Sequence, residues 1–371
     1  MRSNNAATHA SHIPAGPQGV RNDWLERRLA ESGALHRDAR IRTTTAQSLS
    51  EGIGMMGEVT RLHLGYEGAG GINSVIMKSP SPSETNRNVA NAFRLYEREV
   101  LFYREVASRL GPLVPGCYFA EYEKETGNYV ILLEDLHDYR PGDQVLGCDA
   151  EEARLGLDVL ARLHSMWWHG QRRYPWIPGV ADELISAAMI GGCAANWETT
   201  VDIFGGVMPT DLQAAIPTFI NALPRMFAEM ATGPQTLAHT DFRLDNLLFA
   251  TAPEHRPLVV VDWSSVLVSK GAHDVAFLLS QNLRTEERRA HEQELVRYYH
   301  DRLVTAGVTD YNLDECWRDY RFAALFELVY AILIGGSLDV SSPRATSFVS
   351  ALISRCAATI SDLDLLRLIT T

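Results

Sequence analysis

Apolar and polar residues alternate along the first third of the chain and follow a helical period along most of the rest. A short helical stretch at residues 23–31 precedes a segment at residues 41–77 that is typical of strands. Apolar residues alternate between positions 60 and 66, and Val75, Ile76 and Met77 form a β-rich run. The pattern predicts consecutive strands in the first part of the chain.

One helix is expected to interrupt these strands. Residues 88–110 repeat at about 3.6 residues, which places Glu99 on the apolar face with Phe102 and Val106. Two more strands are predicted at residues 118–123 and 128–133, on either side of a Thr-Gly turn.

From residue 149 onward the pattern is mostly helical, beginning with a helix at residues 151–168. Strands first and helices afterwards predict an α+β protein with two lobes. We expect a disordered tail at residues 1–20, a small β-rich N-lobe that binds nucleotide at 21–136, and a larger helical C-lobe at 137–371. The C-lobe would carry the catalytic loop and the acceptor-binding helices.

Composition narrows the class of protein. The chain has 371 residues, 46% of them hydrophobic, and a net charge of −12, which disfavours nucleic acid and anionic membranes as partners. The five cysteines are odd in number and widely spaced, which favours a reduced, cytoplasmic protein. The longest apolar run, residues 322–334, contains Glu327 and is too short to span a bilayer, so we expect a buried helix there.

A glycine-rich segment lies among the expected strands. Residues 52–59 match G-x-G-x-x-G-x-V through Gly52, Gly54 and Gly57. A backbone that covers a triphosphate must approach it closely, which favours glycine. By itself the motif also fits a flexible hairpin turn, but the strand that follows it favours the kinase type over a dinucleotide fold.

A lysine and a glutamate form the second candidate feature. Lys78 ends an apolar strand, and in kinases such a lysine contacts the α and β phosphates and pairs with a helix glutamate. Glu99 is the expected partner because it lies on the apolar face of its helix, where a carboxylate needs a cation. The alternative is a solvated lysine and a glutamate that reaches solvent.

The strongest motif is H-x-D-x-x-x-x-N, formed by His239, Asp241 and Asn246 and followed by Asp262 at the end of a β-rich run. Phosphoryl transfer needs a carboxylate that accepts the proton of the nucleophile, and amide and carboxylate oxygens that hold Mg²⁺. We therefore assign Asp241 as the catalytic base, His239 to the same catalytic loop, and Asn246 and Asp262 as metal ligands.

Two charged residues near this loop have open interpretations. Arg243 is a candidate for stabilising the transferred phosphoryl group, or it pairs with Asp245 or Asp274. Asp274 either caps the helix that begins near it or braces the catalytic loop through backbone hydrogen bonds.

These residues together resemble the aminoglycoside phosphotransferase and choline kinase superfamily, and within it the ecdysteroid-kinase-like phosphotransferases. The resemblance covers roughly residues 40–350 and includes the segments 132–136 and 160–164. It implies a protein-kinase-like fold with ATP between the lobes, Mg²⁺ as the metal, adenine near the backbone of Glu134 and Leu136, and the substrate hydroxyl against Asp241. His164 is expected to be a structural core histidine.

The sequence departs from protein kinases in that Asp262 opens D-W-S instead of D-F-G, and no A-P-E follows. This disfavours a protein substrate. We expect an enzyme that phosphorylates a hydroxyl of a small molecule; a nucleotide-binding pseudokinase is the alternative from another class. The choice between ATP and GTP and the oligomeric state stay open.

The acceptor is expected to meet residues 165–230 and to be neutral or largely apolar, such as a steroid-like alcohol or a hydroxy acid derivative. This segment has few carboxylates for a polycationic sugar, although an aminoglycoside is the alternative. It is instead rich in aromatic and thioether side chains, which suit a flat apolar ligand or else pack the core. The aromatic and thioether residues that carry this argument are Trp167, Trp168, Trp176, Met189, Trp197, Phe204, Met208, Phe219, Met226 and Phe227.

Overall fold

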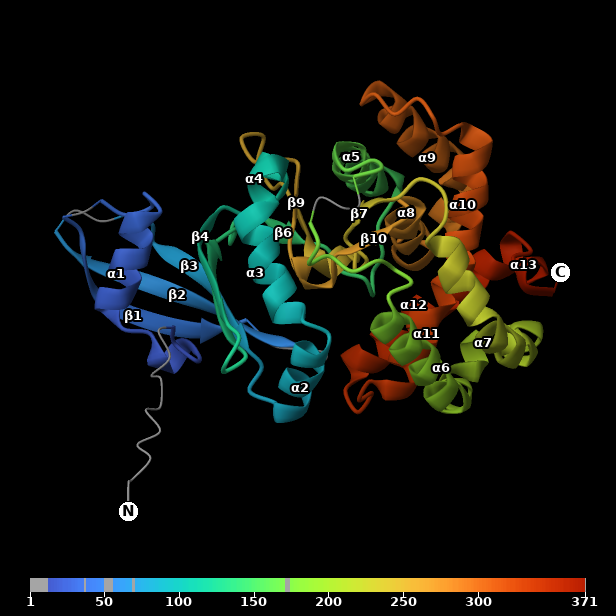
Figure 1. Ribbon diagram of the computed structural model, residues 1–371, viewed down its shortest axis with the longest axis horizontal. Helices are drawn as coiled ribbons and strands as arrows, with labels where there is room; N and C mark the ends of the chain where they lie inside the picture. Colours follow the sequence, from blue (N-terminus) through green and yellow to red (C-terminus); the bar gives the residue numbers. More distant parts are fainter. Residues whose placement is uncertain (1–12, 37, 50–55, 69–70, 171–173, 371) are drawn as a thin grey trace, which may run out of the picture. The chain divides into compact units, whose positions relative to one another are not determined.

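A computed structural model describes residues 13–36, 38–49, 56–68, 71–170 and 174–370. The chain divides into two compact units, one comprising Met1–Arg109 and Pro115–Leu136 and the other Leu110–Val114 and His137–Thr371. The first unit runs from blue to teal in Figure 1, and the second from green to red.

The first unit is built on a five-stranded antiparallel sheet with the order β1-β2-β3-β5-β4 (Figure 1). Its strands are β1 (Arg40–Ser48), β2 (Gly57–Glu67), β3 (Ser74–Pro80), β4 (Cys117–Glu123) and β5 (Asn128–Glu134). The strands expected in this part of the chain are therefore present.

The two faces of this sheet are covered differently. Val75 and Met77 of β3 join a buried cluster with Leu25 and Leu29 of α1 (Asn22–Glu31). Because side chains alternate along a strand, Lys78 lies on the opposite face. Ile13 also belongs to this cluster, so the expectation of a disordered tail as far as residue 20 is wrong for residues 13–20.

The single helix expected at residues 88–110 is broken into three. These are α2 (Glu84–Ala92), α3 (Leu95–Glu105) and α4 (Ala107–Leu110). Arg94 has φ 53°, a left-handed conformation that an α-helix cannot continue through. Hydrophobic periodicity survives such a break, which is why the sequence pattern missed it.

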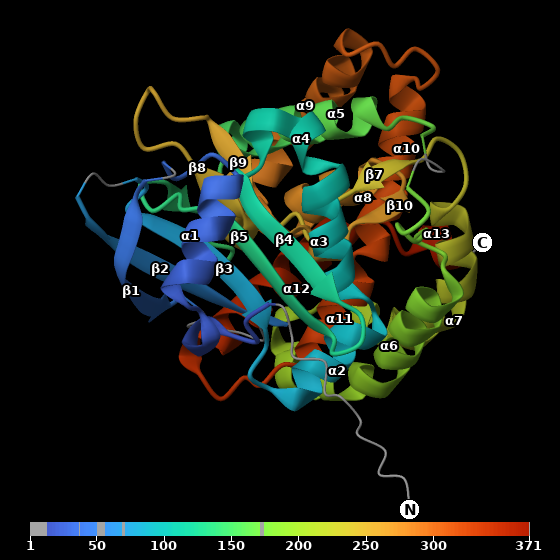
Figure 2. The same ribbon diagram turned by 60° about the vertical axis from the view of Figure 1, so that its left-hand side comes forward.

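The second unit is mainly helical and carries two small sheets. The sheets pair β7 (Thr236–Ala238) with β10 (Leu267–Ser269), and join β6 (Arg140–Pro141), β8 (Leu247–Phe249) and β9 (Leu258–Val260). The main helices are α5 (Ala150–Met166), α6 (Glu183–Phe204), α7 (Thr210–Met230), α8 (Ala272–Phe277), α9 (Thr285–Thr305), α10 (Leu313–Phe326), α11 (Leu328–Ser337) and α12 (Pro343–Asp362), with a short α13 (Arg367–Thr370) at the end. Helices α6 and α11 pack against each other in both views (Figures 1 and 2).

Residues Leu313–Ser337 form one helical stretch that is long and apolar enough to cross a membrane. However, 61% of its most apolar window is buried inside the protein, as in a core helix. The buried helix expected at residues 322–334 is thus present, with a junction between α10 and α11 at the fully buried Glu327.

Candidate active site

In the first unit, Lys78 and Glu99 form the ion pair that the helix periodicity predicted. Lys78 Nζ lies 2.5 Å from Glu99 Oε1, and the two side chains are 11% and 2% exposed. Glu99 comes from α3 and Lys78 from the face of β3 that α1 does not cover. A buried carboxylate requires such a cation, so the pair holds the lysine in a defined position.

The glycine-rich segment lies partly outside the described residues, which include Gly57 but neither Gly52 nor Gly54. Gly57 begins β2, and a Cβ there would lie 2.5 Å from the hydroxyl of Tyr129. A side chain at this position would require the Tyr129 ring to shift. The preceding carbonyl, of Met56, accepts a hydrogen bond from the Tyr96 hydroxyl at 2.5 Å.

The end of β5, where Glu134 and Leu136 were expected to meet adenine, is fixed by side chains of the same unit. Glu134 Oε2 accepts a hydrogen bond from Gly116 N at 2.9 Å. Asp135 accepts two hydrogen bonds from Arg61, at 2.7 and 3.1 Å. The sequence interpretation assigned no role to Asp135, and its partner lies too far away along the chain to be recognised from a local pattern.

In the second unit, the catalytic loop connects β7 to β8 and brings Asp241 and Asn246 together. Asn246 Nδ2 donates to Asp241 Oδ2 at 3.0 Å and to the Asp241 carbonyl at 2.9 Å. The amide nitrogen of Asn246 is thereby used, and its side-chain oxygen is the atom left for a cation.

The Asp241 carboxyl is reachable from solvent yet strongly influenced by its surroundings. Its side chain is 29% exposed. Burial raises the pKa of this carboxyl above its usual range, opposed by the Arg243 charge and reinforced by the Asp262 charge. A carboxyl with a raised pKa is a better proton acceptor when it is ionised.

Asp262 lies beside Asn246 because β8 and β9 form an antiparallel pair. Val261 N donates to the Asn246 carbonyl at 3.0 Å, and Asp262 follows directly in a left-handed conformation with φ 63°. Ser264 Oγ donates to Asp262 Oδ1 at 3.0 Å. This hairpin gathers the oxygen ligands expected for Mg²⁺ at one end of the loop.

Asp274, at the start of α8, braces the catalytic loop. Its two carboxylate oxygens accept hydrogen bonds from His239 N and Thr240 N, both at 2.7 Å. Thr240 has φ 60°, which is unfavourable for a β-branched residue and persists only where the surroundings hold it. Asp274 makes no capping hydrogen bond to α8, so of its two interpretations bracing is the correct one.

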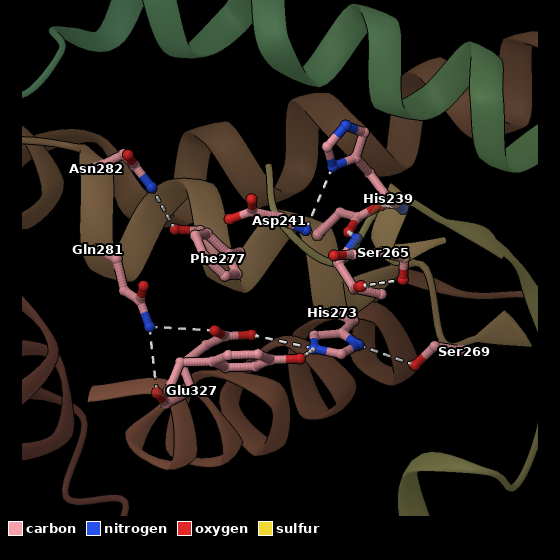
Figure 3. A network of polar contacts seen from close by, with 12 residues as sticks. His239, Asp241, Ser265, Ser269, His273, Phe277, Gln281, Asn282 and Glu327 are labelled. Atoms are coloured by element: carbon pink, nitrogen blue, oxygen red, sulfur yellow. Dashed lines mark hydrogen bonds and ion pairs between the residues drawn. The ribbon is translucent and has the colours of Figure 1, made fainter. Parts of the chain in front are cut away.

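His239 contacts the backbone with both ring nitrogens. Its Nδ1 accepts from Asp241 N at 3.3 Å (Figure 3). Its Nε2 lies 3.1 Å from the Val261 carbonyl oxygen. The ring is fully buried. Through its two contacts it links the catalytic loop to the strand that leads to Asp262.

His164 is the satisfied core histidine that was expected. Its ring bonds to the Tyr299 hydroxyl at 2.7 Å and to Asp274 Oδ2 at 3.1 Å. It therefore supports the aspartate that braces the loop.

Arg243 faces the Asp241 carboxylate. Its Nε lies 3.5 Å from Asp241 Oδ1, beyond hydrogen-bonding geometry, and Nε is buried with no hydrogen-bond partner among the described residues. The Asp241 carboxylate raises the pKa of Arg243, with smaller contributions from Asp245 and Asp262. Neither Asp245 nor Asp274 forms the ion pair with Arg243 that was the alternative interpretation.

The residues of this loop fit a magnesium ion. Magnesium prefers hard oxygen ligands and keeps several waters, so two protein ligands suffice when phosphates supply others. In the part of the chain that the structure describes, no group of three or more His, Cys, Asp and Glu side chains is arranged to hold a metal. Asn246 and Asp262 are the residues that would hold the ion.

Comparison with known proteins agrees with this geometry. The profile of the ecdysteroid kinase-like family matches residues 51–173 and 179–309, which is more than half of the chain. No curated protein matches the sequence.

Two solved structures share the fold. A Ralstonia eutropha protein provisionally assigned as an aminoglycoside phosphotransferase is 16% identical, with a TM-score of 0.54 over 92% of this chain and 97% of its own. Choline kinase from Cryptosporidium parvum is 10% identical, with a TM-score of 0.53 over 88% of this chain and 92% of its own. At these identities the likeness establishes a kinase-like phosphotransferase fold.

Proposed function

The chain belongs to the ecdysteroid kinase-like family, and on this premise we propose that it transfers the γ-phosphoryl group of ATP to a hydroxyl of a small molecule. One observation carries the proposal. The partly exposed Asp241 carboxyl lies beside Asn246 on a loop whose backbone Asp274 holds in a strained conformation. Structural loops rarely keep such an arrangement without a function.

Asp241 would accept the proton of the acceptor hydroxyl as the new bond to phosphorus forms. The hydrogen bond from Asn246 Nδ2 orients Oδ2, and Arg243 faces Oδ1. Arg243 would also offset negative charge on the transferred group. His239 is proposed as a positioning residue, because both of its ring nitrogens are engaged with backbone atoms.

Each unit, taken by itself, offers residues for which a role in nucleotide binding is proposed. Lys78, held by Glu99, would pair with the phosphates, and the backbone near Glu134 and Leu136 would meet adenine. Asn246 and Asp262 would hold Mg²⁺, which when bound offsets the charge of the phosphates.

The structure alters the argument for an apolar acceptor. Six of the ten aromatic and thioether residues that were singled out in the expected acceptor segment are buried in the core, and Trp168 bonds to Asp310. The six are Trp167, Phe204, Met208, Phe219, Met226 and Phe227. For these residues core packing is the correct interpretation.

Helix α6 gives the remaining support for an apolar acceptor. Only three of its 22 residues are buried, although just three are charged. It therefore presents apolar side chains such as Leu184, Met189 and Trp197 without full cover from the protein. An acceptor with a flat apolar body and one reactive hydroxyl fits such a helix.

A phosphorylation screen tests the proposal. Purified protein is incubated with Mg²⁺ and either ATP or GTP, and with panels of sterols, hydroxy acids and aminoglycosides, and products are read by mass. We expect phosphorylated sterols or hydroxy acids and no aminoglycoside product. Efficient turnover of kanamycin-like sugars would overturn the acceptor class, and nucleotide binding without turnover on any panel would favour a pseudokinase.

A further inference from the structure

The helix that braces the catalytic loop does not end as an ordinary α-helix. α8 continues directly into a π-helical turn, η7 (Leu278–Asn282), whose five residues are all buried. Such turns are rare and frequently occur at functional sites.

The last residue of the turn holds the catalytic loop at a second point. Asn282 Oδ1 accepts a hydrogen bond from Leu244 N at 3.0 Å, and Asn282 Nδ2 donates to the Phe277 carbonyl at 2.9 Å (Figure 3). The Asn282 side chain is fully buried. Leu244 lies between the base, Asp241, and the proposed magnesium ligand, Asn246.

The π-helical turn explains why one helix can hold the loop twice. Asp274 and Asn282 are eight residues apart. In a regular α-helix, eight residues make about 2.2 turns, so the two side chains would differ in direction by roughly 80°. One extra residue in a π-turn leaves about seven α-helical steps, which reduces the difference to roughly 20°. Both side chains can then face the same loop.

The backbone of Leu244 is also enclosed at its carbonyl group. A Cβ on Gly142 would lie 2.4 Å from the Leu244 carbonyl oxygen and 3.0 Å from the Leu244 carbonyl carbon. Gly142 N donates to the Leu247 carbonyl at 2.9 Å, which keeps it in place. The backbone of Leu244 is therefore held on both sides of its Cα, at its N–H by Asn282 and at its carbonyl group by Gly142.

We propose that Asn282 is a positioning residue that fixes the metal-binding end of the catalytic loop through Leu244 N, as Asp274 fixes the end that carries the base. The proposal rests on the proposed function, since it gives a role to Asn246 as a magnesium ligand. Loss of the Asn282 contact frees the Arg243–Leu244 peptide, and Asn246 two residues later loses its orientation. The magnesium requirement, meaning the Mg²⁺ concentration that gives half-maximal turnover, then rises by a larger factor than the KM of the acceptor.

The test compares Asn282→Ala, Asn282→Asp and a matched control, Asn312→Ala. Asn282→Asp keeps the oxygen that accepts from Leu244 N. Asn312 Oδ1 also accepts a backbone hydrogen bond, from Glu315 N at 2.9 Å, at the start of α10. The measurement is the Mg²⁺ concentration that gives half-maximal turnover, together with the KM of the acceptor.

Asn282→Ala should raise the half-saturating Mg²⁺ concentration about fivefold to tenfold, in keeping with one lost hydrogen bond behind a metal ligand. Asn282→Asp should restore part of the loss, because a protonated carboxyl can accept from Leu244 N and donate to the Phe277 carbonyl. Asn312→Ala should leave the requirement unchanged. A requirement within twofold of wild type in Asn282→Ala, or an equal rise in the control, would overturn the proposal.

Two further measurements keep the proposal open to refutation. Should Asn282→Ala fail to fold, Gly142→Ala displaces the Leu244 carbonyl without removing a polar group and should also raise the magnesium requirement. An unchanged requirement in that variant counts against the proposal. Should the wild type show no turnover, the proposed function fails, and calorimetry of Mg²⁺-dependent ATP binding in the same variants still decides the role of Asn282.

Discussion

Asp274→Asn removes one of the two oxygens that hold the catalytic loop. In the wild type, burial acts to raise the pKa of Asp274, but the hydrogen bond and charge of His164 hold it below its usual value. The carboxylate is therefore ionised at neutral pH and stabilises the fold there, and this contribution is lost only as the pH falls through the lowered pKa.

The magnitude follows from the two 2.7 Å hydrogen bonds. An asparagine can accept from only one of His239 N and Thr240 N and turns its amide hydrogens toward the other. Losing one charge-assisted hydrogen bond and leaving a buried N–H unpaired costs about 2–4 kcal/mol in the free energy of unfolding. Relaxation of the strained Thr240 should displace Asp241, so kcat should fall as well.

Urea unfolding and steady-state turnover, measured on the same preparation, check this expectation. Asp149→Asn is the control, because Asp149 accepts a hydrogen bond from Glu152 N at the start of α5 and asparagine caps a helix equally well. The control should match the wild type in both measurements. If Asp274→Asn also unfolds and turns over like the wild type, the bracing role is wrong.

Three further variants test other parts of the account. Lys78→Ala should raise the KM for ATP and lower kcat together, and unaltered kinetics would leave the Lys78–Glu99 pair a purely structural contact. Asp262→Ala should weaken Mg²⁺-dependent ATP binding, and calorimetry showing the same affinity as wild type would exclude it as a ligand. Burial lowers the pKa of His273 from 6.5 to about 4, so its unfolded form binds a proton first as the pH falls between those values. This residue should therefore reduce the free energy of unfolding by on the order of 3 kcal/mol at pH 4. Urea unfolding should show that the free energy of unfolding falls less between pH 7 and pH 5 in His273→Gln than in the wild type.

The parts of the site that sequence reasoning predicted are those whose members are close in the chain or carry a periodic signal. Asp241 and Asn246 lie on one loop, and the contact between their side chains follows from that spacing. Glu99 was recognised as the partner of Lys78 because a carboxylate on an apolar helix face needs a cation. The α+β organisation with two lobes likewise followed from strands that precede helices, whereas the kinase-like fold was implied by the family resemblance.

The parts that were missed depend on contacts between distant residues or on local backbone geometry. Asn282 contacts Leu244 from the end of a π-helical turn, and no sequence pattern marks such a turn. The partner of Asp135 is 74 residues away. Whether Phe219 or Met226 lines a pocket or fills the core is equally invisible, since both uses require the same apolar periodicity.

The central claim is that Asp241 is the base of a phosphoryl transfer, and Asp241→Asn tests it most directly. The substitution removes the proton acceptor and leaves Lys78, Asn246 and Asp262 in place. We expect kcat for phosphorylation of the acceptor to fall by about 10²- to 10⁴-fold, while calorimetry shows ATP still bound in the presence of Mg²⁺. A variant that keeps more than about a tenth of the wild-type kcat would contradict the assignment.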